Sequence, residues 1–257
     1  MKHSISLFLL ALLISTTISC NVNREMKNNN LYPASDISIK YQLDWQKKFY
    51  NEKIIEFKNN PIGHGKIVFL GNSITQGLRH HIHEFHREDI VNRGISGDYT
   101  DGVLARLQEI KYYKPKAVFL LIGLNDFFDN NSNRPERTPQ YVAKNIFLIS
   151  NKIQEKSPKT KVFIQTIIPI NNQQYLKDKP NVDFLFPYYE PSINEQINEV
   201  NKILKSNLSL NIIDLHPFFL NENLQLNPKF STDGVHLSDL GYKNWINIVN
   251  PILKEIK

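Results

Sequence analysis

The chain is 257 residues long, with 41% hydrophobic residues and a formal net charge of +6 at pH 7. This composition is typical of a folded globular domain and excludes a disordered, collagen-like or fibrous chain, and the length suits a single domain. Lys and Arg are scattered among acidic residues without a basic block, so we interpret the charge as a solvated surface and expect no nucleic-acid partner.

The N-terminus has the layout of an export signal. An apolar run over residues 5–14, too short to span a bilayer, is followed by small or polar residues up to Cys20, the single cysteine. The site resembles the lipobox of bacterial lipoproteins, although Thr17 stands where that pattern usually has Leu. We predict a signal peptide over residues 1–19 and a lipid on Cys20 that anchors an exported lipoprotein to a membrane, facing the periplasm or the cell surface. The alternative is an ordinary cleaved signal peptide with an incidental cysteine.

The segment after Cys20 is polar and aperiodic, which predicts a flexible tether over residues 20–36 and a folded domain over residues 37–257. In that domain short apolar runs alternate with helical patterns, so we predict an α/β fold with a mostly parallel sheet that helices cover on both faces. The candidate strands are residues 66–70, 89–92, 117–122, 162–167 and 211–215.

Helical patterns lie before and between these strands. Thr138 and the proline after it form a typical helix start, and Ser192 with Glu195 forms a capping-box pattern. Pro251 is expected to bend or end the last helix. The apolar stripes at helical spacing, which we interpret as core, are Tyr41, Trp45, Phe49 and Ile55; Val103, Leu104, Leu107 and Ile110; Val142, Ile146, Ile149 and Ile153; Ile193, Ile197, Val200 and Leu204; and Leu240, Ile248, Val249 and Ile252.

One connection, residues 171–191, is unusually long, and long loops in compact domains are often functional. Its aromatic residues either stack on a substrate or pack the loop against the domain, and both interpretations stay open. These residues are Tyr175, Phe184, Phe186, Tyr188 and Tyr189.

Polar residues follow several predicted strands, at the sheet edge where open parallel sheets bind ligands. Ser73 follows the first strand on a tight turn, and the glycine-rich segment after the second strand contains Gly97. Asn125 follows the third strand, and a backbone N–H near Gly97 with the Asn125 amide would suit an oxyanion hole. Near the C-terminus, His236 and Asp233 supply a base and its orienting carboxylate from one loop.

The segments around Ser73, Gly97, Asn125 and His236, in this order along the chain, resemble the conserved blocks of the SGNH, or GDSL-type, hydrolase family. The resemblance extends from about residue 66 to 253. Residues 94–126 resemble the branch of platelet-activating-factor acetylhydrolase catalytic subunits and bacterial sialate or carbohydrate acetylesterases. The resemblance implies a flavodoxin-like, three-layer αβα sandwich with a five-stranded sheet. It implies a triad of Ser73, His236 and Asp233, an oxyanion hole made by the Ser73 and Gly97 N–H groups and Asn125, an acyl-enzyme intermediate, and no metal or organic cofactor.

One residue departs from the family pattern, since Asn72 stands where the first block usually has Asp. Asn keeps the size and an acceptor oxygen but loses the charge, so we expect Ser73 to remain active.

Several other polar residues have a purely structural interpretation as well as a functional one. The histidines of residues 80–86 suit a surface better than a metal site, because no further ligand has clear spacing. For Arg93 we weigh a surface ion pair against contact with an acidic substrate. Asp98 and Asp126 either support the neighbouring motif residues or cap the helices that follow them. His216 is interpreted as structural.

The resulting hypothesis is a lipid-anchored serine esterase, a carboxylic ester hydrolase that removes short acyl groups, in particular O-acetyl from carbohydrate. Its partners would be a small-molecule or glycan ester and, through Cys20, a membrane. The acetylhydrolase-like branch includes homodimers, but no residue here identifies an interface. Two alternatives remain: a lysophospholipase or thioesterase of the same family, and a non-catalytic surface lipoprotein that binds glycans.

Overall fold

The computed structural model describes residues 31–129, 133–182 and 190–257. The predicted signal peptide, Cys20 and the tether up to residue 30 lie outside the described residues, as do Phe184, Phe186, Tyr188 and Tyr189. Within the described ranges, no helix combines the length and apolar character needed to cross a membrane.

A five-stranded sheet with the order β2-β1-β3-β4-β5, parallel throughout, forms the centre of the domain. All five predicted strands are confirmed, with ends that differ by no more than two residues from those expected. Every residue of β1 and β3 is buried, which explains their continuous apolar sequences. The strands are β1 (Ile67–Gly71), β2 (Ile90–Gly94), β3 (Ala117–Leu121), β4 (Lys161–Gln165) and β5 (Asn211–Ile213).

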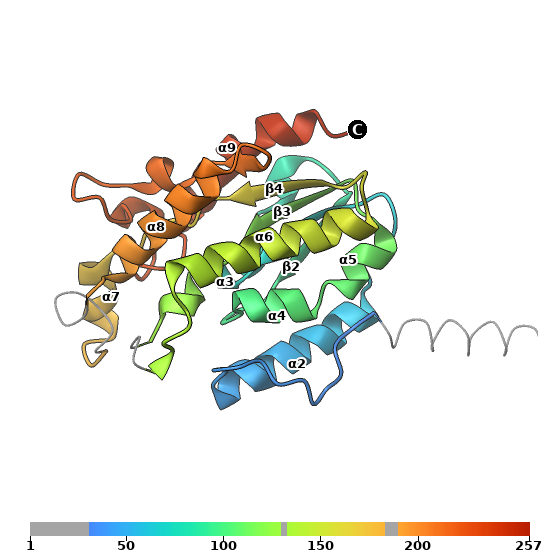
Figure 1. The fold of residues 1–257 in the computed structure, drawn as a ribbon. Helices are drawn as coiled ribbons and strands as arrows, with labels where there is room; N and C mark the ends of the chain where they lie inside the picture. Colours follow the sequence, from blue (N-terminus) through green and yellow to red (C-terminus); the bar gives the residue numbers. More distant parts are fainter. Residues whose placement is uncertain (1–30, 130–132, 183–189) are drawn as a thin grey trace, which may run out of the picture.

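Helices cover both faces of this sheet, as predicted for an αβα sandwich (Figure 1). On one face α6 contacts α4, α5, α8 and β4, and on the other α3 contacts β1 and β2. On that second face the α9 residue Trp245 packs edge-on against Phe69 of β1. The helices are α2 (Asp44–Asn59), α3 (Ser73–Gly77), α4 (Thr100–Ala105), α5 (Gln108–Tyr113), α6 (Pro139–Lys156), α7 (Asn172–Asp178), α8 (Ile193–Ser206) and α9 (Asp239–Lys254).

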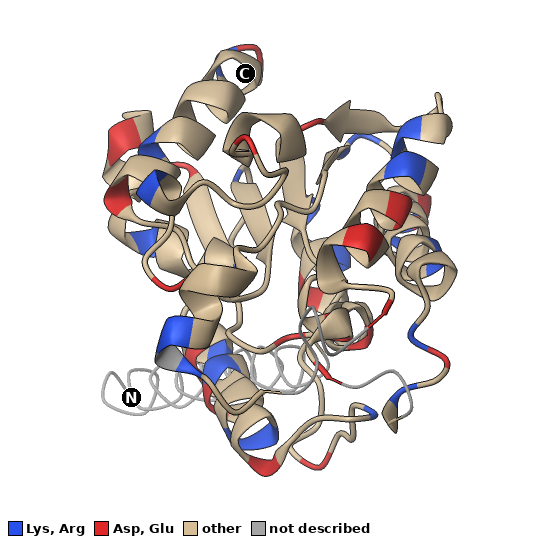
Figure 2. Ribbon diagram, turned by 90° about the vertical axis from the view of Figure 1, so that its left-hand side faces the viewer, with Lys and Arg blue, Asp and Glu red and all other residues tan. Residues whose placement is uncertain are grey.

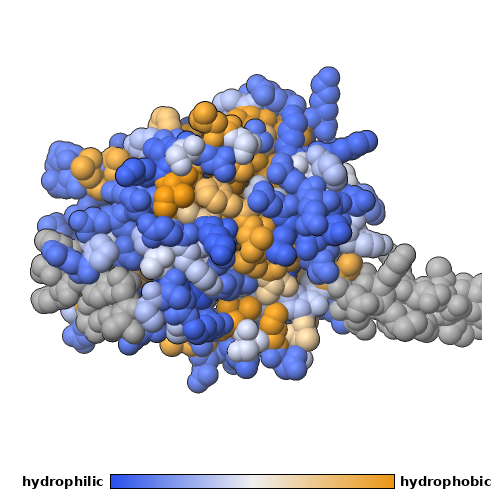
Figure 3. All heavy atoms as spheres, viewed as in Figure 1, coloured by the Kyte–Doolittle hydropathy of each residue, from blue (hydrophilic) through white to orange (hydrophobic). Residues whose placement is uncertain are grey.

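Charged residues of both signs lie mainly on the helices and loops around the sheet (Figure 2). The face drawn in Figure 3 is largely hydrophilic, with small, separate apolar areas. This distribution agrees with the mixed, solvated surface that the sequence suggests.

The starts of α6 and α8 match the sequence patterns. The Thr138 side chain accepts a hydrogen bond from the Tyr141 N–H at the start of α6, and Ser192 and Glu195 form the expected capping box of α8. The predicted stripes of both helices are buried. Side-chain capping and apolar spacing are local properties, which is why the sequence suffices here.

Two predicted helices differ from expectation in their buried face. In α2, Trp45 and Ile55 are 55% and 57% exposed, whereas Tyr50 is buried. Polar Gln46 and Lys53 share that buried face, so the apolar spacing points to the wrong side of the helix. In α9, Leu240 is exposed, and the helix continues past Pro251 to Lys254.

Two further expectations need correction. The stripe that starts at Val103 forms two short helices, α4 and α5, because the chain leaves the helical conformation at Arg106. Packing also begins before residue 37, since Leu31 is buried and the Tyr32 hydroxyl donates to Glu109 at 2.7 Å. The tether prediction is therefore wrong for the first described residues.

Candidate active site

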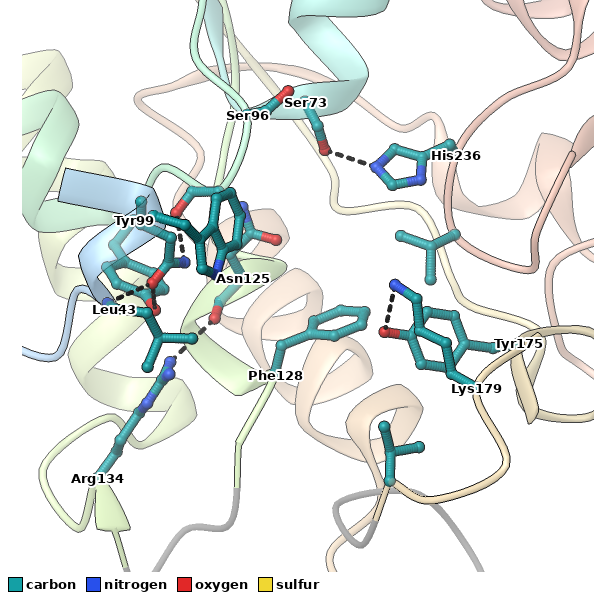
Figure 4. A pocket seen from close by; sticks show the side chains of 15 residues that line it. Leu43, Ser73, Ser96, Tyr99, Asn125, Phe128, Arg134, Tyr175, Lys179 and His236 are labelled. Carbon is teal, nitrogen blue, oxygen red and sulfur yellow. Dashed lines mark hydrogen bonds between the residues drawn. The ribbon is translucent and has the colours of Figure 1, made fainter. Parts of the chain in front are cut away.

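A cavity of about 450 Å³ lies beyond the carboxyl ends of β1, β2 and β3 (Figure 4). The strand order changes direction between β1 and β3, and such switch points are where open parallel sheets bind ligands. The lining residues are Leu43, Trp45, Gln46, Ser73, Ser96, Gly97, Tyr99, Asn125, Phe128, Arg134, Tyr175, Lys179, Val182, Val235 and His236.

Ser73 is presented to this cavity by a sharp turn from β1 into α3. Gly71 allows the turn, because a Cβ atom there would lie 2.1 Å from the Leu121 carbonyl oxygen of β3. Asn72 is the N-cap of α3, and its Oδ1 accepts from the Ile74 N–H at 3.1 Å. The acceptor oxygen that Asn shares with Asp is thus in use, and the substitution leaves the turn intact.

His236 and Asp233 extend from the loop before α9 towards Ser73. Nε2 of His236 lies 3.1 Å from Oγ of Ser73, and Nδ1 lies 2.7 Å from Oδ2 of Asp233. Since an ionised carboxylate only accepts hydrogen bonds, Nδ1 carries the proton and Nε2 is left to accept from the serine hydroxyl. The structure therefore joins the three side chains in one hydrogen-bonded chain.

The Asp233 carboxylate is fixed by its own loop. Its Oδ1 accepts from the backbone N–H groups of Val235 at 2.9 Å and His236 at 2.7 Å. Burial acts to raise the pKa of Asp233, but the hydrogen bonds from the His236 side chain and backbone outweigh burial and hold that pKa below its ordinary value. Asp233 is therefore charged at neutral pH and oriented towards the imidazole.

Asn125 lies across the cavity from His236 (Figure 4), and Gly97 lines the same cavity. The Asp98 N–H donates to the Ile95 carbonyl at 3.1 Å, which closes a turn in which Gly97 has a φ of +76°. That φ belongs to the third position of a type II turn and favours glycine. Nδ2 of Asn125 donates to the Asp98 carbonyl at 3.0 Å, so the amide is tied to the same turn.

Buried ion pairs support these loops from behind. Asp98 bonds Arg106, and Asp126 bonds Arg137 and accepts from Thr100 at the start of α4. Asp98 thus supports a motif segment, whereas Asp126 caps α4 from a distant loop. Sequence patterns do not reveal the two arginines, because their pairing with Asp98 and Asp126 depends on how the loops fold and not on a regular spacing.

The position of Arg93 fits neither a surface ion pair nor contact with an acidic substrate. Its side chain is 6% exposed and forms a two-pronged ion pair with Glu109, at 2.9 Å for each contact. It also donates to the Asn60 carbonyl at 2.7 Å, so it joins the segment after α2 to α5. Arg93 is therefore neither a surface group nor a lining residue of the cavity.

The remaining histidines show no metal cluster in the described part of the chain. His81 bonds Glu84 at 2.8 Å and stacks on Tyr242, with ring centroids 4.7 Å apart. His216 is half-buried at the end of the sheet, and burial lowers its pKa. It does not line the cavity around Ser73.

Much of the cavity wall is missed by the sequence analysis. Trp45, predicted to be core, is an exposed lining residue, and Tyr175 of the long connection lies in α7 and also lines the cavity. Phe128 faces Tyr175 in Figure 4, and Lys179 lies beside Tyr175, with its Nζ 3.3 Å from the Tyr175 hydroxyl oxygen. No local pattern marks Trp45, Phe128 and Lys179 as lining residues, because they come together only through the fold, whereas Tyr175 is one of the aromatic residues noted in the long connection.

Comparisons with known proteins identify the family of the chain. A family model described as the GDSL-like Lipase/Acylhydrolase family matches residues 69–243. The alpha2 subunits of platelet-activating factor acetylhydrolase IB from rat and human are each 26% identical over 187 residues, covering 68% of this chain and 70% of theirs. A GDSL-like lipase from Bacteroides thetaiotaomicron superposes with a TM-score of 0.62 at 22% identity, covering 80% of this chain and 97% of its own.

An acetyl xylan esterase has a TM-score of 0.53 at 21% identity, covering 74% of this chain and all of its own (100%). At such identities these structures show the shared fold alone, whereas the family model spans more than half of the chain. The chain therefore belongs to the GDSL-like lipase/acylhydrolase family and is a carboxylic ester hydrolase.

Proposed function

We propose that the protein is a serine esterase that removes short acyl groups, in particular O-acetyl groups from carbohydrate. The observation that carries the proposal is the hydrogen-bonded chain from Asp233 through His236 to Ser73, which opens on the cavity. Nucleophile, base and orienting carboxylate in this arrangement suit acyl transfer.

In the proposed mechanism Nε2 of His236 takes the proton of Ser73 as Oγ attacks the ester carbonyl carbon. The Ser73 and Gly97 N–H groups and Nδ2 of Asn125 stabilise the negative oxygen of the tetrahedral intermediate. The imidazolium, stabilised by Asp233, then protonates the departing alcohol. Water attacks the acyl-enzyme with His236 as base again, which releases the acid and restores Ser73.

The cavity supports a carbohydrate ester as the substrate class. Its volume of about 450 Å³ is within the usual range for small-molecule sites. Trp45, Tyr99, Phe128 and Tyr175 line it with aromatic rings, which provide flat apolar surfaces beside polar groups. The acetyl part of the proposal follows the curated relatives, which are named as acetylhydrolases.

We also propose that the protein is exported and held at a membrane by a lipid on Cys20. The only support is the sequence of residues 1–20, in which an apolar run is followed by small or polar residues and then Cys20. An anchored esterase outside the cytoplasm would meet acetylated glycans at the cell surface, which agrees with the substrate class.

Hydrolysis of p-nitrophenyl acetate, butyrate and octanoate tests the proposed function. We expect kcat/KM to be highest for acetate and to fall to background in the Ser73→Ala variant, because the proposed substrate carries a two-carbon acyl group. A preference for octanoate would contradict the short-acyl proposal and favour a lysophospholipase or thioesterase. Absence of turnover by folded protein on esters and on acetylated oligosaccharides would contradict catalysis and favour a glycan binder.

A further inference from the structure

Helix α2 contributes Trp45 and Gln46 from its first turn to the cavity wall, together with its N-cap residue Leu43, yet it lies before the residues that match the family model. Gln46 is 6% exposed, so its amide is almost fully withdrawn from water. A buried amide without partners would be costly, and each of its polar atoms is in fact hydrogen-bonded.

The contacts of Gln46 fix the orientation of its amide. Oε1 accepts from the Leu43 N–H at 2.8 Å and from the Tyr99 hydroxyl at 3.0 Å. Nε2 donates to the Gly97 carbonyl oxygen at 3.0 Å. A flipped amide would set Nε2 against the Leu43 N–H and Oε1 against the Gly97 carbonyl oxygen, so both backbone bonds would be lost.

The turn that Gln46 holds is the one that carries a proposed oxyanion donor. Glycine is the most conformationally free residue, so outside contacts help to keep the Gly97 backbone in one conformation. It lies tightly against α2: a Cβ atom there would be 2.8 Å from the Trp45 ring and 3.1 Å from Cγ of Gln46. The glycine therefore permits the close approach of the helix that restrains it.

The two carbonyls at the end of this turn are each held by a side-chain amide. Gln46 binds the Gly97 carbonyl from α2, and Asn125 binds the Asp98 carbonyl from the loop after β3. A shift of the Gly97–Asp98 backbone would therefore move both proposed oxyanion donors, the Gly97 N–H and the Asn125 amide.

We propose that Gln46 is a positioning residue that holds the Gly97 turn in the geometry required for oxyanion stabilisation, so that α2 is a working part of the active site. The inference rests on the proposed function. Gln46 acts through Gly97 and does not touch the reacting atoms. Since misplacement of catalytic groups by about 1 Å can cost on the order of 100-fold in rate, we expect a loss in kcat of at least about tenfold without Gln46.

Gln46→Met and Gln46→Glu test the proposal, with Tyr50→Phe as the matched control. Methionine keeps the approximate length without hydrogen bonds, whereas Glu retains both acceptor contacts and loses the donor that faces Gly97. Tyr50 lies one turn further along α2, and its hydroxyl donates to the Gly102 carbonyl at 2.9 Å, away from the cavity. Each substitution thus removes a buried hydrogen bond from a side chain of α2 to the backbone. A loss of kcat in the Gln46 variants alone would therefore not be explained by a general loss of stability.

We expect both Gln46 variants to lower kcat for p-nitrophenyl acetate at least about tenfold with KM changed less than about threefold, and Tyr50→Phe to leave both unchanged at temperatures where all variants are folded. If Gln46→Met does not fold, Gln46→Glu decides the test. Equal kcat for the Gln46 variants and wild type, or a rise in KM alone, would overturn the inference. Wild-type protein without Ser73-dependent turnover would instead overturn the proposed function.

Discussion

Replacement of His236 by alanine is expected to lower kcat for ester hydrolysis by on the order of 10⁴-fold or more. A serine hydroxyl is a poor nucleophile without a base, and Nε2 of His236 is the base 3.1 Å from the Ser73 oxygen. The His236 side chain is 44% exposed, so its removal should change the free energy of unfolding by less than about 1 kcal/mol. Steady-state kinetics and thermal unfolding of the same preparations measure both quantities.

His83→Ala is the matched control, since His83 is exposed and does not line the cavity. It removes the same side chain from the histidine-rich segment and should leave kcat unchanged. Retention of more than a tenth of wild-type kcat by folded His236→Ala protein would contradict its role as the base.

The largest loss of stability is expected from Arg106→Met. The Arg106 guanidinium is 4% exposed, pairs with the fully buried Asp98 at 2.9 Å and donates to the Gly71 carbonyl at 3.0 Å. Loss of one partner of a buried pair costs about 3–5 kcal/mol, because the other charge is left buried without compensation. For a chain of this size that cost corresponds to a fall in Tm of about 6–20 °C, which calorimetry measures directly.

Lys205→Met serves as the control for Arg106. Its ion pair with Asp214, at 3.0 Å, is largely exposed, and such pairs contribute about 1 kcal/mol or less. Burial raises the pKa of Asp98 and Arg106 opposes that rise, so the Arg106→Met substitution should raise the pKa of Asp98 further. Similar Tm values for the two variants would show that the buried pair does not hold the Gly71 and Asp98 loops together.

The sequence predicts most of the fold because the relevant signals are local. Continuous apolar runs identify the five strands, and the helix starts at Thr138 and Ser192 are visible as capping patterns. The buried faces of α2 and α9 are not predictable in this way. In α2 the packed side includes Gln46, whose partners Tyr99 and Gly97 are more than 50 residues away.

Ser73, Gly97 and Asn125 are predictable because they follow β1, β2 and β3, whose ends meet at one edge of the sheet, and the Asp233 and His236 pair because both lie in one loop. The residues that support the site are not predictable in this way. Arg106 and Arg93 resemble any surface arginine in the sequence, and their burial depends on Asp98 and Glu109 reaching them through the fold. The walls of the cavity likewise combine α2, α7 and loops that no sequence pattern connects.

Covalent capture of Ser73 tests the central proposal most directly. A fluorophosphonate that reacts with activated serines should modify the protein once, and peptide mass spectrometry should place the modification on Ser73. The His236→Ala variant should react at least about 100-fold more slowly, because its Ser73 lacks the base. Labelling at another residue, or equal labelling rates for wild type and His236→Ala, would contradict the assignment of Ser73 as a nucleophile activated by His236.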